Sequence, residues 1–250
     1  VCDTSIHWHG IELDNDSDGT GVTQNHVKPG ESYTYRFKAP RSGLFWFHPH
    51  MEPGPQTFAG MYGAFIVKDP NEPALQTTKK IPGPSGTHTI VLSDIEFDTD
   101  DATGVPTGEG GTVGYVALGV AQPWASWKTW CHEGFGDGDV AAQQGACRFM
   151  FDGLRWLVNG RHPFIYDGTQ TFDNIPTITA TSGEGIRLRL INTATNRYFR
   201  LRVSGNGNDN NLYRIGGEGG FLEKVRLEGG MLGNWDTKYQ KGEIVIPASG

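Results

Sequence analysis

Short apolar stretches separated by turn residues dominate the hydrophobic pattern of this chain. Residues 33–37 alternate apolar and polar positions, which is typical of a half-buried strand. Residues 44–47 are continuously apolar and predict a strand buried on both faces, and residues 61–67 predict another strand. Residues 185–191 alternate again, which predicts a strand with one face in water. With no convincing amphipathic helix, the pattern favours a β-sandwich.

Proline-rich residues divide the chain into two expected domains. Residues 71–88 contain three prolines and a lysine pair, which indicates an interdomain linker. We therefore expect a first domain over residues 1–70 and a second over residues 89–250. Within the second domain, residues 98–153 lack a regular pattern and are interpreted as an insertion or a long loop. Further strand patterns occur at residues 89–92, 155–160, 198–203 and 221–227.

Composition and charge narrow the possible partners. The chain has 36 glycines and 14 prolines among 250 residues, which suits many short strands joined by turns. Its formal net charge of −7 gives no electrostatic reason to expect nucleic acid or an anionic membrane as partner. No apolar run approaches the roughly 20 residues that a membrane helix needs.

Three cysteines leave the redox state open. Cys131 and Cys147 flank one loop, and they are either a disulfide formed in an oxidising compartment or two buried thiols. Cys2 is left as a free thiol or pairs with a residue outside this sequence.

Two His-x-His pairs carry the most specific chemical signal. These are His7 with His9, and His48 with His50. Because alternate side chains of a strand share one face, both imidazoles of a pair point the same way, about 6.5 to 7 Å apart. That spacing suits two neighbouring metal ions better than one, and two facing pairs would create a site for several ions. Imidazole suits copper, zinc, iron or nickel.

The surroundings of these pairs resemble one enzyme family. The string IHWHG at residues 6–10 resembles the first copper motif of multicopper oxidases, and GLFWFHPH at residues 43–50 resembles the second. Residues 22–24 and 28–37 between them follow the spacing of the family, and residues 59–67 resemble the strand that closes its first cupredoxin domain. Three strings of the second half resemble the middle domain more loosely, at residues 156–160, 187–192 and 219–223. The resemblance implies an all-β fold of tandem cupredoxin-like Greek-key β-sandwiches.

The resemblance also implies a function and a role for each histidine. Members of the family couple one-electron oxidation of a substrate to the four-electron reduction of dioxygen to water at copper. By motif, His7 would bind the type 2 copper, whereas His9, His48 and His50 would bind the type 3 pair. The electron donor would be a small molecule or a metal ion, as for a laccase-like enzyme. We expect a secreted, periplasmic or extracellular protein.

Other residues near the motifs have weaker assignments. Trp8, Trp46 and Phe47 are expected to pack around the imidazoles, exclude water and fix the orientation of the rings. Asp18 lies where the resemblance implies a carboxylate that delivers protons, although an ordinary solvated acidic turn explains it as well. The remaining histidines match no pair and are interpreted as surface or packing residues: His26, His88, His132 and His162.

Part of the family's ligand set does not occur in these 250 residues. The sequence has no His-Cys-His string, and no cysteine has the setting of a type 1 copper ligand. We therefore expect truncation at both ends, a missing carboxyl-terminal cupredoxin domain or partner chain, and no oxidase activity from these residues alone. Two alternatives stay open: a non-catalytic copper-binding cupredoxin-type protein, and a zinc-dependent hydrolase.

Overall fold

The structure, a computed structural model, describes most of the chain outside one long central segment. The described residues are 3–51, 53–58, 60–95, 155–161, 164–166, 171–173, 177–181, 183–195, 197–204, 211–229 and 242–249. The expected insertion at 98–153, all three cysteines, His132 and His162 lie outside these ranges. Within them, no helix has both the length and the apolar character needed to cross a membrane.

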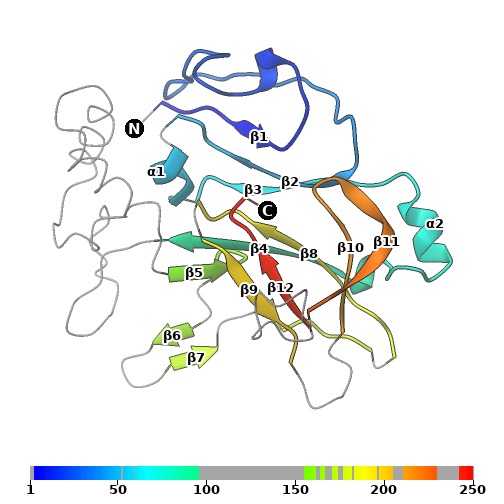
Figure 1. Ribbon diagram of the computed structural model, residues 1–250. Coiled ribbons are helices and arrows are strands. Elements are labelled where there is room, and N and C mark those ends of the chain that lie inside the picture. Colours follow the sequence, from blue (N-terminus) through cyan, green and yellow to red (C-terminus); the bar gives the residue numbers. More distant parts are fainter. Residues whose placement is uncertain are drawn as a thin grey trace, which may run out of the picture.

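The first sheet contains both histidine pairs. It consists of three antiparallel strands in the order β1 (His7–His9), β2 (Gly43–His48) and β3 (Gly63–Val67). In Figure 1 these strands occupy the upper part of the molecule, above β4, β5 and β8. The predicted strands at 44–47 and 61–67 are confirmed.

The second half of the chain builds a sheet beside the first one. β4 (Thr87–Ile95) pairs antiparallel with β5 (Arg155–Val158) and parallel with β8 (Arg187–Asn192). Tyr62, which precedes β3, contacts this sheet through a hydrogen bond between its hydroxyl and that of Ser93, at 2.6 Å.

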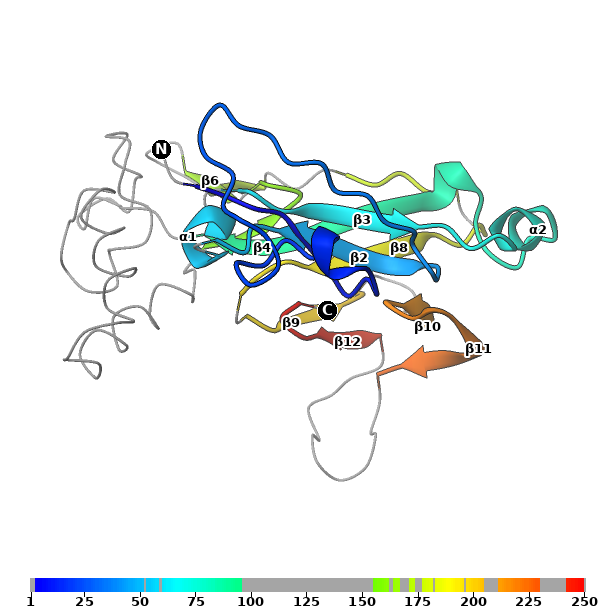
Figure 2. The same ribbon diagram turned by 90° about the horizontal axis from the view of Figure 1, so that it is seen from above.

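Two strand pairs form a second layer. β9 (Phe199–Arg202) pairs with β12 (Glu243–Ile246), and β10 (Leu212–Gly217) pairs with β11 (Gly220–Glu228), both antiparallel. Figure 2 shows these four strands as a layer below β2, β3, β4 and β8. A further antiparallel pair is β6 (Phe164–Tyr166) with β7 (Thr171–Asp173).

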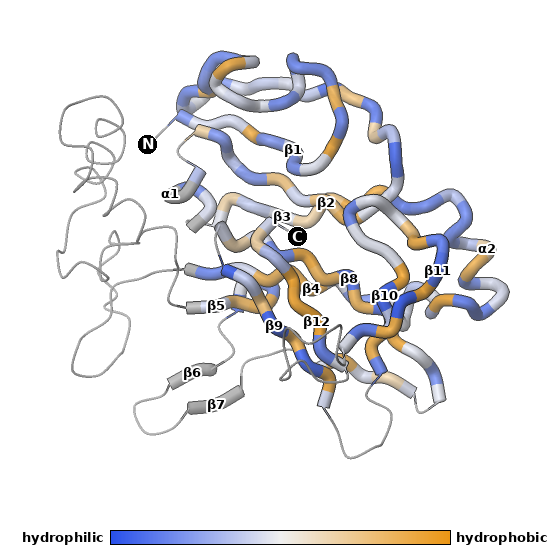
Figure 3. The backbone as a smooth tube through the Cα atoms, viewed as in Figure 1, coloured by the Kyte–Doolittle hydropathy of each residue, from blue (hydrophilic) through white to orange (hydrophobic). Residues whose placement is uncertain are grey.

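The hydrophobic core lies between these layers. β2, β4, β8 and β12 each contribute apolar side chains that are at most 5% exposed: Phe45, Trp46, Leu92, Ile191 and Ile246. Figure 3 shows the same concentration of apolar residues along β8 and β12, whereas the loops around β1 are largely hydrophilic. Burial of apolar surface therefore holds the layers together and leaves the β1 end for polar chemistry.

Helices are few and short in the described ranges. They are α1 (Pro53–Phe58), α2 (Glu72–Thr77) and the 3-10 turns η1 (Asn15–Ser17) and η2 (Pro84–Gly86). α1 follows the second histidine pair, and its Gln56 donates a 2.8 Å hydrogen bond to the Asp3 carbonyl just before β1. α2 and η2 fall within residues 71–88, the segment for which the sequence predicts a linker.

Two expectations about strands are wrong. Residues 33–37 form no strand: the Arg36 amide donates to a side chain, Ser17 Oγ, instead of a neighbouring strand, and the Tyr35 hydroxyl accepts from the Ile6 amide. The strand at residues 187–192 has no wet face. The side chains of Arg187 and Arg189 are only 10% and 11% exposed, because both pair with Glu72 of α2.

Candidate metal centre

The pairing of β1 with β2 gathers histidines on one face of the first sheet. The register places His7 opposite His48, and His9 opposite Trp46. Because directly opposed residues of an antiparallel pair share a face, these four side chains lie on the same side. The backbone pairing of β1 with β2 thus brings His7 and His9 together with His48.

The four rings lie close to one another. The His7 ring centroid is 5.9 Å from that of His9, 5.4 Å from that of His48 and 5.2 Å from that of His50. The His48 and His50 centroids are 6.2 Å apart, although β2 ends at His48. Within the described ranges, no group of three or more His, Cys, Asp or Glu side chains is placed to hold one metal ion. The imidazoles therefore share a face without forming a closed single-ion site.

Hydrogen bonds decide which ring nitrogen of each histidine is free. His7 Nδ1 lies 2.7 Å from the Asp18 carbonyl, and His48 Nδ1 lies 2.9 Å from the Pro49 carbonyl. A carbonyl only accepts, so these Nδ1 atoms carry the proton and Nε2 is left as the lone-pair nitrogen. His9 Nδ1 is buried and has no hydrogen-bond partner. An unpaired buried nitrogen beside other imidazoles is suited to a metal ion.

The loop that holds His7 depends on one glycine. Gly19 has a φ of +80°, and a Cβ built there would lie 1.8 Å from the Ile6 carbonyl oxygen. Only a residue without a side chain allows this approach. The Ser5 hydroxyl, which is buried, also donates to the Gly19 carbonyl. These contacts fix the loop against the chain before β1 and keep the Asp18 carbonyl at His7.

Burial keeps two of the rings uncharged. It lowers the pKa of His48 to about 4; the Pro49 carbonyl opposes this shift, and His7, His9 and His50 add to it. The pKa of His9 is also lowered, first by burial and then by the neighbouring His7. Both rings are therefore neutral at neutral pH, which is the form that binds metals.

Comparison with known proteins identifies the family. Two family models, each described as multicopper oxidase, match residues 2–72 and residues 136–208, which together make up more than half of the chain. The chain belongs to the multicopper oxidase family. The family implies copper as cofactor.

Two curated relatives show how much of a whole oxidase is present. The multicopper oxidase MmcO of Mycobacterium tuberculosis is 31% identical over 214 residues, covering 81% of this chain and 34% of the relative. Copper resistance protein A of Pseudomonas syringae pv. tomato is 29% identical over 242 residues, covering 90% of this chain and 35% of the relative. The chain thus spans about a third of the length of these relatives.

A solved structure shows the same fold. The blue copper oxidase from Nitrosomonas europaea matches 99% of this chain and 57% of its own, with a TM-score of 0.59 and 20% identity. The predicted fold, an all-β arrangement of cupredoxin-like β-sandwiches, is confirmed.

Of the three aromatic residues expected around the imidazoles of this multicopper oxidase, only Trp46 contacts them. Its ring stacks on His48 at 4.4 Å and lies 5.2 Å from His9. Trp8 and Phe47, which oppose each other in the register, lie on the other face, with Trp8 also packed on Phe65. The expectation for Trp8 and Phe47 was wrong because side chains alternate between the faces of a strand.

Of the other polar residues, some lie near the four imidazoles and some do not. The Asp18 carboxylate lies 3.5 Å from His7 Nδ1 and is 31% exposed, so it is both near the face and open to solvent. His26 is exposed and lies 3.7 Å from Asp3. Sequence reasoning missed Glu218, whose Oε1 lies 4.0 Å from His9 Nδ1. It is 209 positions from His9 along the chain, and no local pattern marks it.

Proposed function

We propose that this chain supplies one half of the copper-binding face of a laccase-like multicopper oxidase. The enzyme would couple one-electron oxidation of a substrate to four-electron reduction of dioxygen to water. The observation that carries the proposal is the common face of His7, His9 and His48, with His50 beside it at 5.2 Å from His7.

The four histidines fit copper in chemistry and in orientation. Imidazole nitrogen is a preferred copper ligand. Carbonyls hold the Nδ1 atoms of His7 and His48, which directs Nε2 of each ring toward the ion, and His9 would bind through its unpaired Nδ1. We assign His7 to the type 2 copper, and His9, His48 and His50 to the type 3 pair.

Copper bound on this face would pass to dioxygen the electrons that the oxidised substrate supplies. The protein residues would do the rest: Trp46 covers the His48 ring and excludes water from that side. Asp18 is the candidate proton donor, because its carboxylate is partly exposed and close to His7. Reduction of dioxygen to water consumes protons, so an acid between solvent and the metal face has a chemical purpose.

The remaining copper ligands belong, in this proposal, to parts of the protein outside these 250 residues. They would come from a further cupredoxin domain or a partner chain and would include the type 1 site. The electron donor would be a small molecule or a metal ion, and the protein would act in a secreted, periplasmic or extracellular location. Residues 1–70 would form one cupredoxin domain and 89–250 a second, joined at 71–88. The first sheet lies within the first range and β5 to β12 lie within the second, which supports this division, whereas β4 (Thr87–Ile95) begins two residues before the second range.

Metal analysis of the full natural protein tests the proposal. We expect several copper ions per protein and dioxygen consumption with a phenolic or metal-ion donor. In the variants His9→Ala and His48→Ala, copper content should fall and dioxygen consumption should drop by at least about 100-fold. The matched control is His26→Ala, which removes an exposed histidine of the same half of the chain and should leave both unchanged. Zinc in place of copper, or full activity in His48→Ala, would contradict the proposal.

A further inference from the structure

Arg41 joins the end of β1, the strand of His7 and His9, to the hairpin of β10 and β11. Arg41 Nη2 donates to the Gly10 carbonyl at 2.8 Å, directly after β1, and Nη1 donates to the Glu218 carbonyl at 2.6 Å. Its Nε pairs with the Glu12 carboxylate at 2.8 Å, and the guanidinium carbon lies 4.9 Å from the centre of the Phe45 ring. All three nitrogens are used, so the rigid fork fixes the turn between β10 and β11 against the end of β1.

This turn presents a carboxylate to the metal face. Glu218 Oε1 lies 4.0 Å from His9 Nδ1. A Cβ built on Gly10, whose φ is +82°, would lie 1.8 Å from the same oxygen. The carboxylate therefore occupies the space that any other residue at position 10 would fill, and glycine at that position admits it.

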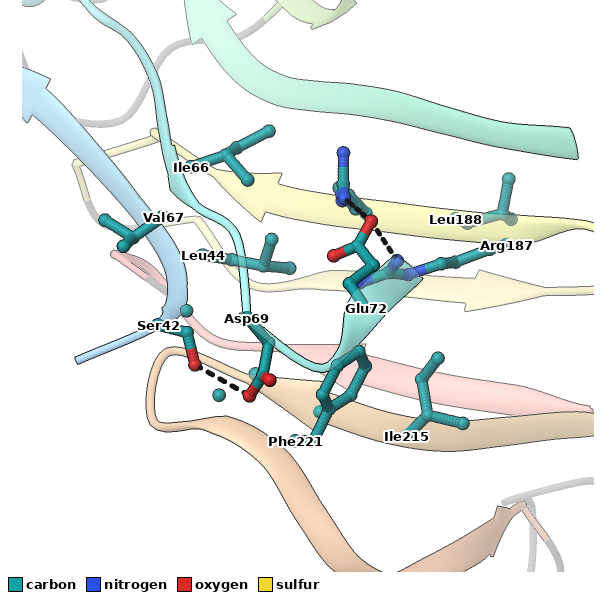
Figure 4. Close-up of a pocket in the computed structure, with 15 residues that line it drawn as sticks. Ser42, Leu44, Ile66, Val67, Asp69, Glu72, Arg187, Leu188, Ile215 and Phe221 are labelled. Carbon is teal, nitrogen blue, oxygen red and sulfur yellow. Dashed lines mark hydrogen bonds and ion pairs between the residues drawn. The ribbon is translucent and has the colours of Figure 1, made fainter. Parts of the chain in front are cut away.

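The hairpin that carries Glu218 is also contacted from its other side. Figure 4 shows Phe221 of β11 near Asp69, which follows β3, and a hydrogen bond of 3.2 Å joins Asp69 to Ser42, which precedes β2. A half-open cavity of about 60 Å³ lies there, and its lining includes Ser42, Asp69 and Phe221. Arg187 also lies over the Phe221 ring at 5.2 Å. The turn is thus held in place independently of the Glu218 side chain.

We propose that Glu218 is a positioning residue for the copper face, which holds a negative charge beside the free nitrogen of His9. At 4.0 Å the two atoms are too far apart for a hydrogen bond, so the carboxylate acts through its charge and by filling space. A cation bound by His9 would gain attraction from this charge, which no residue of the His-x-His motifs supplies. The inference rests on the proposed role of His9 as a copper ligand.

Copper affinity of the full natural protein tests this role. Glu218→Gln keeps the shape of the side chain and the carbonyl bonded to Arg41, but removes the charge. We expect copper retention against a competing chelator to fall about tenfold, which is typical when a partner of a metal ligand is lost. Arg41→Lys keeps the charge but loses the fork, and should lower copper retention as well. The thermal midpoint of copper-free Glu218→Gln should equal that of the natural protein.

Two further variants separate the possible outcomes. Glu223→Gln removes an exposed carboxylate from the same hairpin and should retain copper as the natural protein does. His9→Ala measures the ligand itself. If His9→Ala loses copper while Glu218→Gln retains it, the role of Glu218 is overturned and the proposed function stands. If His9→Ala retains all its copper, the proposed function fails at this residue, and the role of Glu218 fails with it.

Discussion

Two polar clusters lie toward opposite ends of β2 and differ in how their members are paired. At the Gly43 end, the Glu72 carboxylate forms an ion pair with Arg187 at 3.0 Å and accepts a hydrogen bond from Arg189 at 2.9 Å, and the three side chains are only 8 to 11% exposed. At the His48 end, the polar groups are like groups: four imidazoles whose rings crowd within 5.2 to 6.2 Å. One cluster pairs opposite charges, and the other leaves lone pairs free.

The difference separates a structural cluster from the cluster proposed to bind copper. Burying a charge is costly unless it is paired, and Glu72 pairs with both guanidinium groups and ties α2 to β8. The imidazole cluster gains nothing from crowding in the absence of an ion, and His9 Nδ1 stays buried without a partner among the described residues. A fold tolerates such an arrangement where it serves binding. Breaking each cluster should therefore have opposite consequences for stability and for copper binding.

The largest effect on stability is expected from Glu72→Ala. It leaves Arg187 and Arg189 buried without their shared carboxylate, and removal of one partner of a buried pair costs about 3 kcal/mol or more. Urea unfolding of the copper-free protein should show this loss, whereas the number of copper ions bound by the folded protein should not change. The exposed Glu223→Ala is the control and should stay within about 0.5 kcal/mol of the natural protein. Equal stability of the two variants would show that the buried cluster contributes nothing.

An intermediate effect is expected from Gly19→Ala, which strains the loop beside the imidazoles. The added methyl group would clash with the Ile6 carbonyl at a positive φ, so a loss of about 2 kcal/mol and weaker copper binding should occur together. Gly30→Ala separates the two causes, because Gly30 has a similar φ of +84° but open space around it. It should cost about 1 kcal/mol and leave copper binding unchanged. Weaker copper binding in Gly30→Ala would show that the loop at Gly19 has no special role.

The sequence predicts the imidazole cluster but not the Glu72 cluster, and the reason is physical. A His-x-His pair encodes its own geometry, because alternate residues of a strand share a face whatever surrounds them. Arg187 and Arg189 also alternate, yet alternation alone predicts a wet face; only packing against α2, 115 positions earlier in the chain, makes it dry. Glu218 was missed for the same reason, since its position beside His9 depends on the docking of a distant hairpin. Local periodicity predicts the face of a side chain, and tertiary contacts decide what that face meets.

The smallest effect is expected from acid, and it should act on the imidazole cluster. The folded pKa of His48 is about 4, below its ordinary value of 6.5, so the unfolded chain takes up a proton first as the pH falls. Stability of the copper-free protein should therefore decrease between pH 6.5 and pH 4. The loss should be on the order of 1 kcal/mol at pH 5, because the ring is only partly buried and water screens its charge. His48→Gln cannot take up this proton, so unfolding curves of both proteins at pH 7.5 and pH 5 isolate the effect from the titration of other groups. Between pH 7.5 and pH 5 the natural protein should lose more stability than the variant does. An identical response of the two proteins to acid would show that burial does not hold His48 in its neutral form.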